Sequence, residues 1–440
     1  AILFCLPVIS LAQSAYLSES STYSSWLERM EIKLQRNPDL NVLTAKPLSR
    51  RTAVRVGHYA DSVMQQEPGF FSRVDRYRLN SLYNDNPEWM SSDSLLFPSR
   101  HRLFNTFYKT PAHFFEVREK DFFLSVNPVL QYRISSEQGN SERLYVNTRG
   151  TAIRGLIAKR LGFSVLLLEN QERGPRFYKD RVNEFQAVPG VGFYKSFKQT
   201  GYDYFDGRGS INFTAARYLD LQFGYDKNFI GSGYRSLFLS NFGNSYLFFK
   251  TQTRIWKLNY LTLFMELNRA FRDGIQDRLF DKKYAAIHHL GVQATPWLTI
   301  GVFDAVIFGR KNRFDFTYLN PVILLRLAEQ QNGSADNSFV GMDFKANIKK
   351  RAQVYGQVMI DEFLLKEMRS RKGWWANKYG LQFGMKYLDL FGTSHLDLQA
   401  ELNLVRPFTY AHYDSISSYT HYNQPLAHPL GANFRELILL

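Results

Sequence analysis

The side chains best suited to chemistry are cations beside aromatic rings, in and next to one segment of alternating residues. Lys250 and Arg254 lie on the polar face of residues 245–257, Lys257 follows at the next turn, and the loop 231–241 (GSGYRSLFLSN) precedes them. If this strand and loop line one side of a lumen, the cations form a basic wall that opens towards the outside. A guanidinium binds a carboxylate or phosphate through two parallel N–H groups, and a neighbouring tyrosine ring can stack on a sugar. An anionic glycan is therefore the predicted ligand, and its candidate residues are Tyr234, Arg235, Lys250, Arg254 and Lys257.

Arg235 has a second interpretation. Arginines inside a protein often form ion pairs, so Arg235 could instead be tied to Asp226 or to another interior acid. Both interpretations place the side chain in a polar interior, and the sequence leaves them open.

Other reactive-looking pairs do not make a catalytic or metal site. Asp361 and Glu362 are adjacent, as are His288 and His289. Adjacent residues on a strand point to opposite faces, which argues against a glycosidase or a metal site. No Ser–His or Asp–His spacing stands out either. We expect no enzyme activity, no cofactor and no metal.

The elements that position these residues alternate with period two, which is strand geometry. In 219–226 and 247–255, apolar and aromatic residues share one face and polar residues share the other. Phe, Tyr and Trp make up 16% of the chain. An apolar aromatic face opposite a polar face predicts an all-β membrane protein, a large antiparallel outer-membrane β-barrel with lipid outside and a polar lumen.

Further strands follow in pairs along the chain. They are predicted near 121–133, 143–158, 161–170, 210–217, 219–227, 245–257, 259–268, 285–294, 296–308, 338–349, 352–363, 378–388 and 393–404. Their connections alternate between short turns and long loops, as in barrels with periplasmic turns and outer loops. The long loops are 171–209, 228–244, 269–284, 309–337, 364–377 and 405–433.

Residues 20–90 have helical periodicity instead. Tyr23, Leu27 and Met30 begin an amphipathic stripe, and two further short helices follow before Pro87. Such short helices bury little alone. We expect a helical plug in the periplasmic mouth, and a separate periplasmic helical domain is the alternative. A further helix over 318–331, capped by Asn320 and Pro321, is expected to fold into or over the outer mouth and constrict it.

Both ends of the chain carry their own expectations. Residues 1–12 resemble the remainder of a secretory signal peptide. Cys5, the only cysteine, lies inside this segment, so the mature chain is expected to lack thiols. The barrel is assigned to 118–440, with further C-terminal strands missing, because a barrel leaves no open edge in lipid.

The net charge of +15 suggests an anionic partner. Secretion argues against nucleic acid, so the expected partners are outer-membrane lipid and an anionic surface polysaccharide. The expected location is the outer membrane of a Gram-negative bacterium. A porin or substrate channel is the alternative function.

Several stretches resemble the Wzi-type outer-membrane family, which includes capsule-assembly proteins and Bacteroidetes relatives linked to gliding motility. The stretches are 231–241, 253–258 (TRIWKL), 318–321 (YLNP), 336–337, 354–357 (VYGQ), 361–363 and 426–433 (LAHPLGAN). The resemblance implies a barrel of about eighteen strands when complete, plugged by a small helical bundle. It also implies a surface lectin that holds capsular polysaccharide, or a role with surface or motility proteins, and no catalytic residues.

Overall fold

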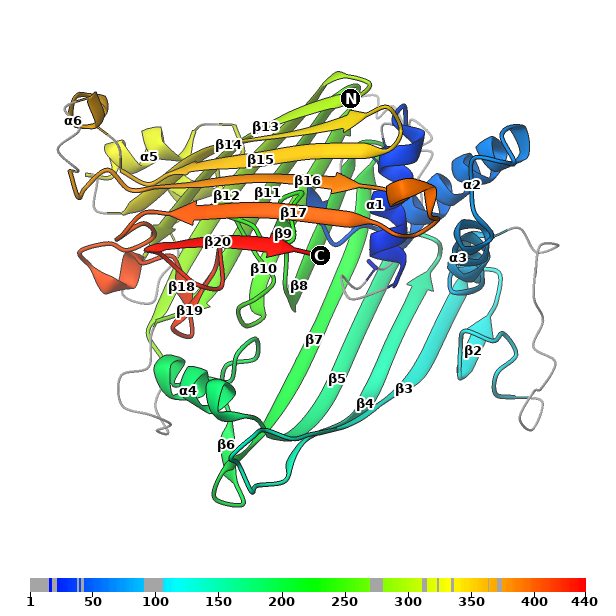
Figure 1. Ribbon diagram of the computed structural model, residues 1–440, viewed down its shortest axis with the longest axis horizontal. Helices are drawn as coiled ribbons and strands as arrows, with labels where there is room; N and C mark the ends of the chain where they lie inside the picture. Colours follow the sequence, from blue (N-terminus) through cyan, green and yellow to red (C-terminus); the bar gives the residue numbers. More distant parts are fainter. Residues whose placement is uncertain are drawn as a thin grey trace, which may run out of the picture.

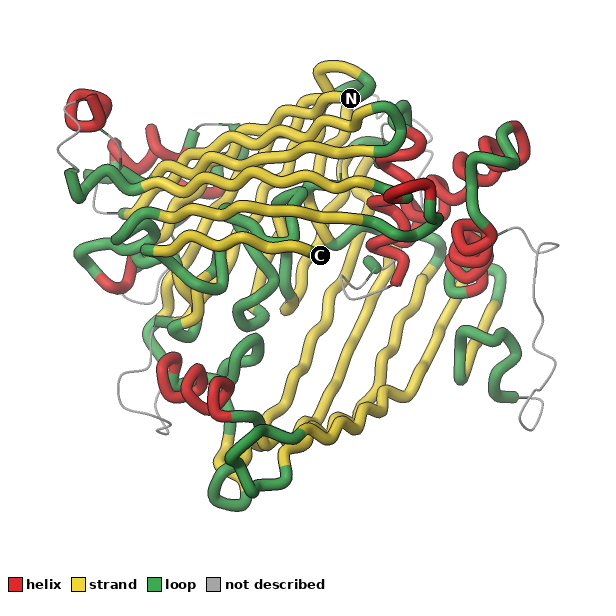
Figure 2. The backbone as a smooth tube through the Cα atoms, in the orientation of Figure 1, coloured by secondary structure: helices red, strands yellow, loops and turns green. Residues whose placement is uncertain are grey.

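The computed structural model describes residues 16–17, 22–37, 39–40, 43–90, 106–269, 280–310, 315–322, 324–333, 336–362, 364–369 and 374–440. The predicted signal segment, 1–12, lies outside these residues. Most of the described chain forms one antiparallel sheet that curls around an interior, with the three N-terminal helices at one end and shorter helices at the other (Figures 1 and 2). None of the described helices is long and apolar enough to cross a membrane.

The sheet runs in the order β2-β3-β4-β5-β7-β8-β10-β11-β12-β13-β14-β15-β16-β17-β20, with β6 paired to β7. Its strands are β2 (Phe115–Arg118), β3 (Phe122–Ser135), β4 (Leu144–Ile157), β5 (Leu161–Arg173), β6 (Lys195–Phe197), β7 (Gly201–Ala216), β8 (Leu219–Asp226), β10 (Tyr246–Ile255), β11 (Leu258–Asn268), β12 (Lys282–Thr295), β13 (Leu298–Phe308), β14 (Asn337–Ile348), β15 (Ala352–Ile360), β16 (Tyr379–Tyr387), β17 (Leu398–Val405) and β20 (Phe434–Leu439). Short pairs outside the sheet are β1 (Ala45–Lys46) with β9 (Phe229–Ile230), and β18 (Thr420–His421) with β19 (Gln424–Pro425).

The helices are α1 (Thr22–Leu34), α2 (Arg50–Gln66), α3 (Arg73–Asn84), α4 (Arg176–Phe185), α5 (Leu325–Gln331) and α6 (Leu365–Arg369), with 3₁₀ turns η1 (Pro87–Trp89), η2 (Phe316–Leu319), η3 (Leu390–Gly392) and η4 (Ser415–Ser417). Ser49 caps α2, and Ser72 and Asp75 form a capping box on α3. Helices α1 to α3 share one hydrophobic core, in which Leu27 and Met30 are fully buried.

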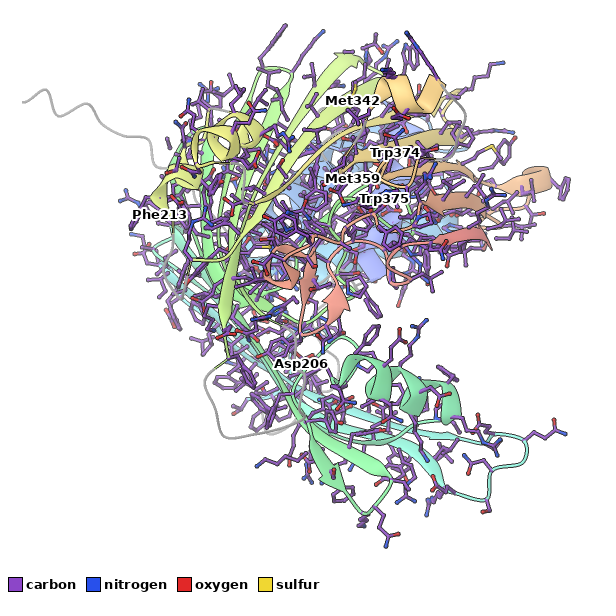
Figure 3. All side chains as sticks on the ribbon, turned by 90° about the vertical axis from the view of Figure 1, so that its left-hand side faces the viewer. Asp206, Phe213, Met342, Met359, Trp374 and Trp375 are labelled. Atoms are coloured by element: carbon purple, nitrogen blue, oxygen red, sulfur yellow. The ribbon has the colours of Figure 1, made fainter. Side chains whose placement is uncertain are left out.

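The two faces of the sheet follow the predicted alternation. On β10, Leu247 and Phe249 are each nearly 40% exposed, whereas Lys250 and Gln252 are buried. In the view from the long-loop end, Phe213 points out of the wall and Asp206 lies on its inner side (Figure 3). The apolar face is thus the outer surface and the polar face lines the interior, as the barrel prediction requires.

The connections also divide as predicted. Turns of two or three residues lie at the end that holds α1 to α3, together with the ten-residue connection 388–397 between β16 and β17, and the other long connections lie at the opposite end (Figure 1). We call these the short-turn end and the long-loop end. The wall is uneven in length, because β3 has 14 residues and β15 has nine.

The helical plug is held to the inner wall by charge. Helix α1 places Glu31 Oε1 2.6 Å from Lys345 Nζ on β14, and both side chains are 2% exposed. Arg29 binds Asp389 and Asp397 in the turn between β16 and β17, at 2.6 and 2.9 Å. The fold class is therefore confirmed, and α1 lies against the inner wall.

Some sequence expectations for the connections were wrong. The loop placed at 171–209 contains α4 and β6, and β7 already begins at Gly201. The helix predicted over 318–331 is divided into η2 and the short α5, so Asn320 and Pro321 precede α5 without capping it. β17 begins at Leu398 instead of residue 393, and β2 was not predicted.

Two long connections fold into the interior. Leu237, Phe238 and Leu239 of the loop 228–245 pack with Tyr410 and Tyr419 of the loop 406–433 against the inner wall of β11 to β15. The Phe238 ring stacks on Phe303 at 4.3 Å between centroids. This core fills the interior along that side of the wall.

The loop 406–433 is held at the long-loop end by a buried carboxylate, which predicts a pH effect. Asp361 Oδ2 accepts a hydrogen bond of 2.9 Å from the Tyr410 backbone N–H. Burial raises the pKa of Asp361 to about 7, although Lys378 opposes the shift. The unfolded chain has an ordinary carboxyl pKa near 4, so stability is highest below about pH 4 and falls as pH rises to about 7.

We expect Asp361→Asn to remove that slope from the free energy of unfolding, measured by urea titration at several pH values. A slope between pH 4 and 7 that survives in Asp361→Asn would assign the titration to another group.

Candidate cationic cavity at the short-turn end

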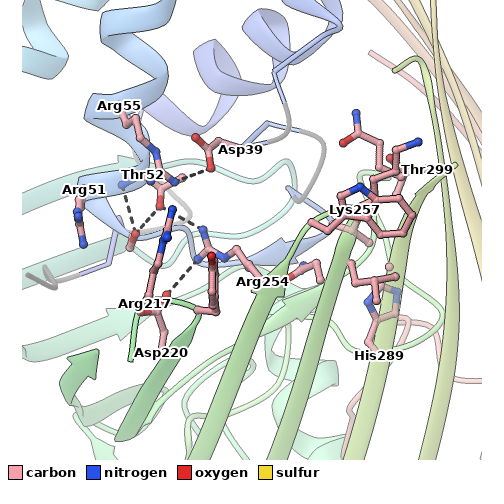
Figure 4. A pocket seen from close by; sticks show the side chains of 18 of the residues that line it. Asp39, Arg51, Thr52, Arg55, Arg217, Asp220, Arg254, Lys257, His289 and Thr299 are labelled. Carbon is pink, nitrogen blue, oxygen red and sulfur yellow. Dashed lines mark hydrogen bonds and ion pairs between the residues drawn. The ribbon is translucent and has the colours of Figure 1, made fainter. Parts of the chain in front are cut away.

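A cavity of about 480 Å³ lies at the short-turn end, between α2 and the turns that join β7 to β8 and β10 to β11 (Figure 4). Five cationic side chains line it against two carboxylates. The cations are Arg51, Arg55, Arg217, Arg254 and Lys257, and the acids are Asp39 and Asp220. The excess of positive charge in a partly enclosed space attracts an anionic group.

The two acids are each paired within the cavity. Asp39 binds Arg55, and Asp220 lies 3.4 Å from Arg254. Five cations against two acids leave the cavity with a net positive charge, so its own acids do not neutralise it.

Arg254 is the most tightly held of the cations. Its Nη1 donates to Thr52 Oγ1 of α2 at 3.3 Å, and its side chain is 20% exposed. Its Nε is buried and makes no hydrogen bond within the described part of the chain. A buried N–H group without an acceptor is costly, and an anionic ligand oxygen would satisfy it.

Aromatic rings lie at the edge of the cavity. Trp256 and Tyr218 occupy the two turns and are 82% and 44% exposed. The Arg217 guanidinium lies 5.1 Å from the centre of the Tyr218 ring, and Lys257 Nζ lies 5.5 Å from that of Trp256. Rings next to cations suit a ligand with both flat apolar faces and negative charge.

The structure separates the five sequence-predicted site residues. Arg254 and Lys257 line the cavity at the short-turn end. Lys250 lies on the same strand face but is 3% exposed, donates to Asn228 Oδ1 at 2.9 Å and packs on the Tyr16 ring. The expected single basic wall, opening towards the long-loop end, was therefore wrong.

Tyr234 and Arg235 lie across the interior against β17. Their backbone N–H groups donate to the Glu401 carboxylate at 2.7 and 3.1 Å. The Arg235 guanidinium is 3.8 Å from Glu436 on β20. The alternative of an ion pair with an interior acid is confirmed for Arg235, with Glu436 as the partner instead of Asp226.

Glu401 is the main anchor of this loop. It is 1% exposed and also accepts from Tyr355 Oη at 2.8 Å and from Asn403 Nδ2 at 2.9 Å. Gly233 lies so close that an added Cβ would stand 2.4 Å from Glu401 Oε2. The loop therefore needs glycine at 233 to reach the carboxylate.

Sequence reasoning missed Arg51, Arg55 and Arg217. Arg217 belongs to a two-residue turn, and the two other arginines lie one turn apart on α2, where spacing of four places side chains on one face. That spacing was a usable signal, but nothing in the sequence showed that α2 faces the turns.

His289, another residue that lines the cavity, binds Asp343 at 2.7 Å. Within the described ranges, no three His, Cys, Asp or Glu residues are grouped to hold a metal.

The inward polar face, the outward apolar face and the helical plug define an outer-membrane β-barrel. Among solved structures, the chain is similar to Wzi of Escherichia coli, an outer membrane protein involved in group 1 capsule assembly and described as a carbohydrate-binding β-barrel. The TM-score is 0.51 with 13% identity, over 97% of this chain and 80% of Wzi. This likeness confirms a Wzi-like fold.

Other solved barrels overlap less well. OccK11 (OpdR) of Pseudomonas aeruginosa has a TM-score of 0.35 with 10% identity, over 66% of this chain and 74% of its own. The anion-selective porin of Comamonas acidovorans has a TM-score of 0.28 with 10% identity, over 64% and 89%. No protein-family model and no curated protein matches the chain.

Proposed function

We propose that this chain is an outer-membrane barrel of a Gram-negative bacterium that binds an anionic polysaccharide. The cationic cavity carries the proposal, because it joins five cations to two exposed aromatic rings. Guanidinium groups suit the carboxylates or phosphates of such a glycan. The Wzi-like fold agrees with a binding function.

The cavity implies a direction for binding. Short turns of outer-membrane barrels face the periplasm, so the glycan would meet this site from the periplasmic side. A role in capsule anchoring or in a surface or motility assembly would then begin with binding of the glycan on the periplasmic side of the outer membrane.

A channel is the second candidate, and one observation favours it. A second cavity of about 590 Å³ lies along the inner wall of β3 to β8, lined by polar groups that include Ser125, Asn127, Ser164 and Arg208. The packed core of the loops 228–245 and 406–433 fills the other side. Single-channel conductance in planar bilayers separates the candidates: a binding barrel stays closed, and a porin conducts steadily.

Arg217→Ala is expected to weaken binding of a uronic-acid oligosaccharide roughly tenfold or more, measured by calorimetry in detergent. A hydrogen bond to a charged group contributes about 1.5–3 kcal/mol, and each 1.4 kcal/mol is about tenfold in affinity. Binding should also weaken as salt rises, because screening acts over about 8 Å at physiological ionic strength.

The matched control is Arg149→Ala, which removes an exposed outer-wall arginine paired with Glu169. It should bind the oligosaccharide as the parent protein does, and a neutral oligosaccharide of equal length should bind weakly to both. Equal affinity of Arg217→Ala and the parent for the acidic glycan, at low and high salt, would remove the cavity from the proposal.

A further inference from the structure

The long connection between β13 and β14 lies on the outer wall of the barrel. Phe303 on β13 packs with the interior core, so its neighbour Asp304 points outward. Asp304 faces His288 on β12, which in turn faces Thr262 on β11. A polar row therefore crosses the face of the wall that should meet lipid.

This polar row is covered. Thr262, His288 and Asp304 are at most 6% exposed, although they face outward. Residues 315–322 and 324–331, which contain η2 and α5 and are called the strap below, lie over them. Tyr318, Leu325 and Ala328 of the strap pack with outward residues of three strands in one cluster, whose wall members are Phe264, Tyr284, Ala286, Val306 and Phe308. The strap therefore does not constrict the mouth, and that expectation was wrong.

Hydrogen bonds hold the strap to the wall at two depths. The Leu325 backbone N–H donates to Asp304 Oδ2, and Tyr260 Oη donates to the Pro321 carbonyl oxygen, each at 2.5 Å. Tyr260 faces Leu290, which faces Val302. Val302 lies about 20 Å along β13 from Phe308 at about 3.3 Å per residue. The strap thus descends well into the apolar band, which is about 25 Å tall in such barrels.

The upper end of the strap is fixed by an ionic cluster. Arg310 at the end of β13 binds Asp336 at 2.5 Å and Asp315 at 3.3 Å. Tyr318 Oη donates to Asp336 Oδ2 at 2.5 Å. These bonds tie the two ends of the connection together at the long-loop end.

The outward side of the strap carries a row of apolar residues, beside which the polar Thr317, Asn320, Gln330 and Gln331 are also exposed. Phe316 and Val322 are 78% and 86% exposed, and Leu319, Leu324 and Leu327 are also exposed. Of its two acids, Asp315 binds Arg310, and Glu329 is turned inward and 1% exposed. Arg326 reaches Ser338 Oγ near the top of β14 at 2.5 Å, where a long side chain can extend to the headgroups. An outward row of apolar side chains above a buried carboxylate suits a surface in contact with lipid.

We propose that the strap is an intramembrane element whose apolar ridge contacts the acyl chains of membrane lipid. It continues the lipid-facing surface of the barrel over a place where the wall itself is polar. A carboxylate facing lipid is costly, and the strap removes that cost by giving Asp304 a backbone donor and a dry cover. This inference does not depend on the glycan site.

The test uses nitroxide labels on single cysteines at Val322 and Leu327 in liposomes, with Cys5 replaced by alanine. Collision rates with oxygen, which concentrates in acyl chains, and with a water-soluble nickel chelate report the environment of each label. Both strap labels should collide several-fold more with oxygen than with nickel, as a label at Phe383 on the outer face of β16 should. A label at Tyr413, exposed in the loop 406–433, should show the reverse.

These side chains point away from the protein, so labelling them should not disturb folding. A difference in gel migration between unheated and heated samples verifies that each labelled variant is folded. Nickel accessibility at Val322 and Leu327 equal to that at Tyr413 would overturn the proposal. Quenching of a Val322→Trp variant by lipids brominated on their acyl chains gives a second readout. Its expected result is more quenching than in the parent protein, and equal quenching would count against the strap.

Discussion

Replacing Lys345 with methionine is expected to lower the free energy of unfolding by about 3–5 kcal/mol, because it leaves a buried carboxylate without its cation. Glu31 of α1 and Lys345 of β14 are both 2% exposed and lie 2.6 Å apart. Burial already raises the pKa of Glu31, and Lys345 opposes that shift. Without Lys345, Glu31 must take up a proton or pull α1 away from the wall.

Urea unfolding of the folded barrel in micelles measures this loss, and limited proteolysis of α1 to α3 shows whether the plug detaches. Adding Glu31→Gln to Lys345→Met should recover most of the stability, since no charge is then buried alone. The control is Arg149→Met, which breaks the exposed ion pair with Glu169 and should change the free energy of unfolding little. Equal losses for Lys345→Met and Arg149→Met would mean that the plug does not depend on its buried pair.

The second large effect is expected at Glu401. In Glu401→Ala, the backbone N–H groups of Tyr234 and Arg235 and the hydroxyl of Tyr355 lose their acceptor. Each unsatisfied buried group costs about 1–3 kcal/mol, so the variant, with three such groups, should lose about 3–9 kcal/mol or release the loop. A released loop would leave space inside the barrel and raise conductance in planar bilayers.

Glu401→Gln is the matched control, because one carbonyl oxygen can still accept from the loop. It should keep the barrel closed and lose less stability than the alanine variant. If Glu401→Ala and Glu401→Gln behave alike in both assays, the loop is held by its apolar residues and the carboxylate contributes little.

Alternation along a strand predicted the faces of the wall well. The period of two placed Lys250 and Arg254 inside and Phe249 outside, and burial agrees at each position. The pair His288 and His289 also separates as expected, one outward and one inward. Such predictions succeed because the face of a strand residue depends only on local backbone geometry.

Contacts between distant segments were not predictable in the same way. Arg235 was expected near Lys250 because the two are close in sequence, yet the loop crosses the interior to Glu401. Leu237, Phe238 and Leu239 were an available signal, since three apolar residues in a row seldom remain in water. Their burial inside the barrel depends on Phe303 and Tyr410, far along the chain, which no local pattern reveals.

The uneven wall has a consequence for the mouth of the barrel. Strand β3 carries outward apolar residues from Leu124 to Ile134, and its 14 residues extend about 46 Å, whereas the nine residues of β15 extend about 30 Å. Opposite Leu130, however, the outward side chains on β4 and β5 are Arg149 and Glu169, an exposed ion pair. Charged side chains are costly in lipid, so the apolar surface of this flank ends below that pair and the rest of its length stands in water. The longer flank therefore adds a raised polar rim on one side of the mouth instead of a taller surface for lipid.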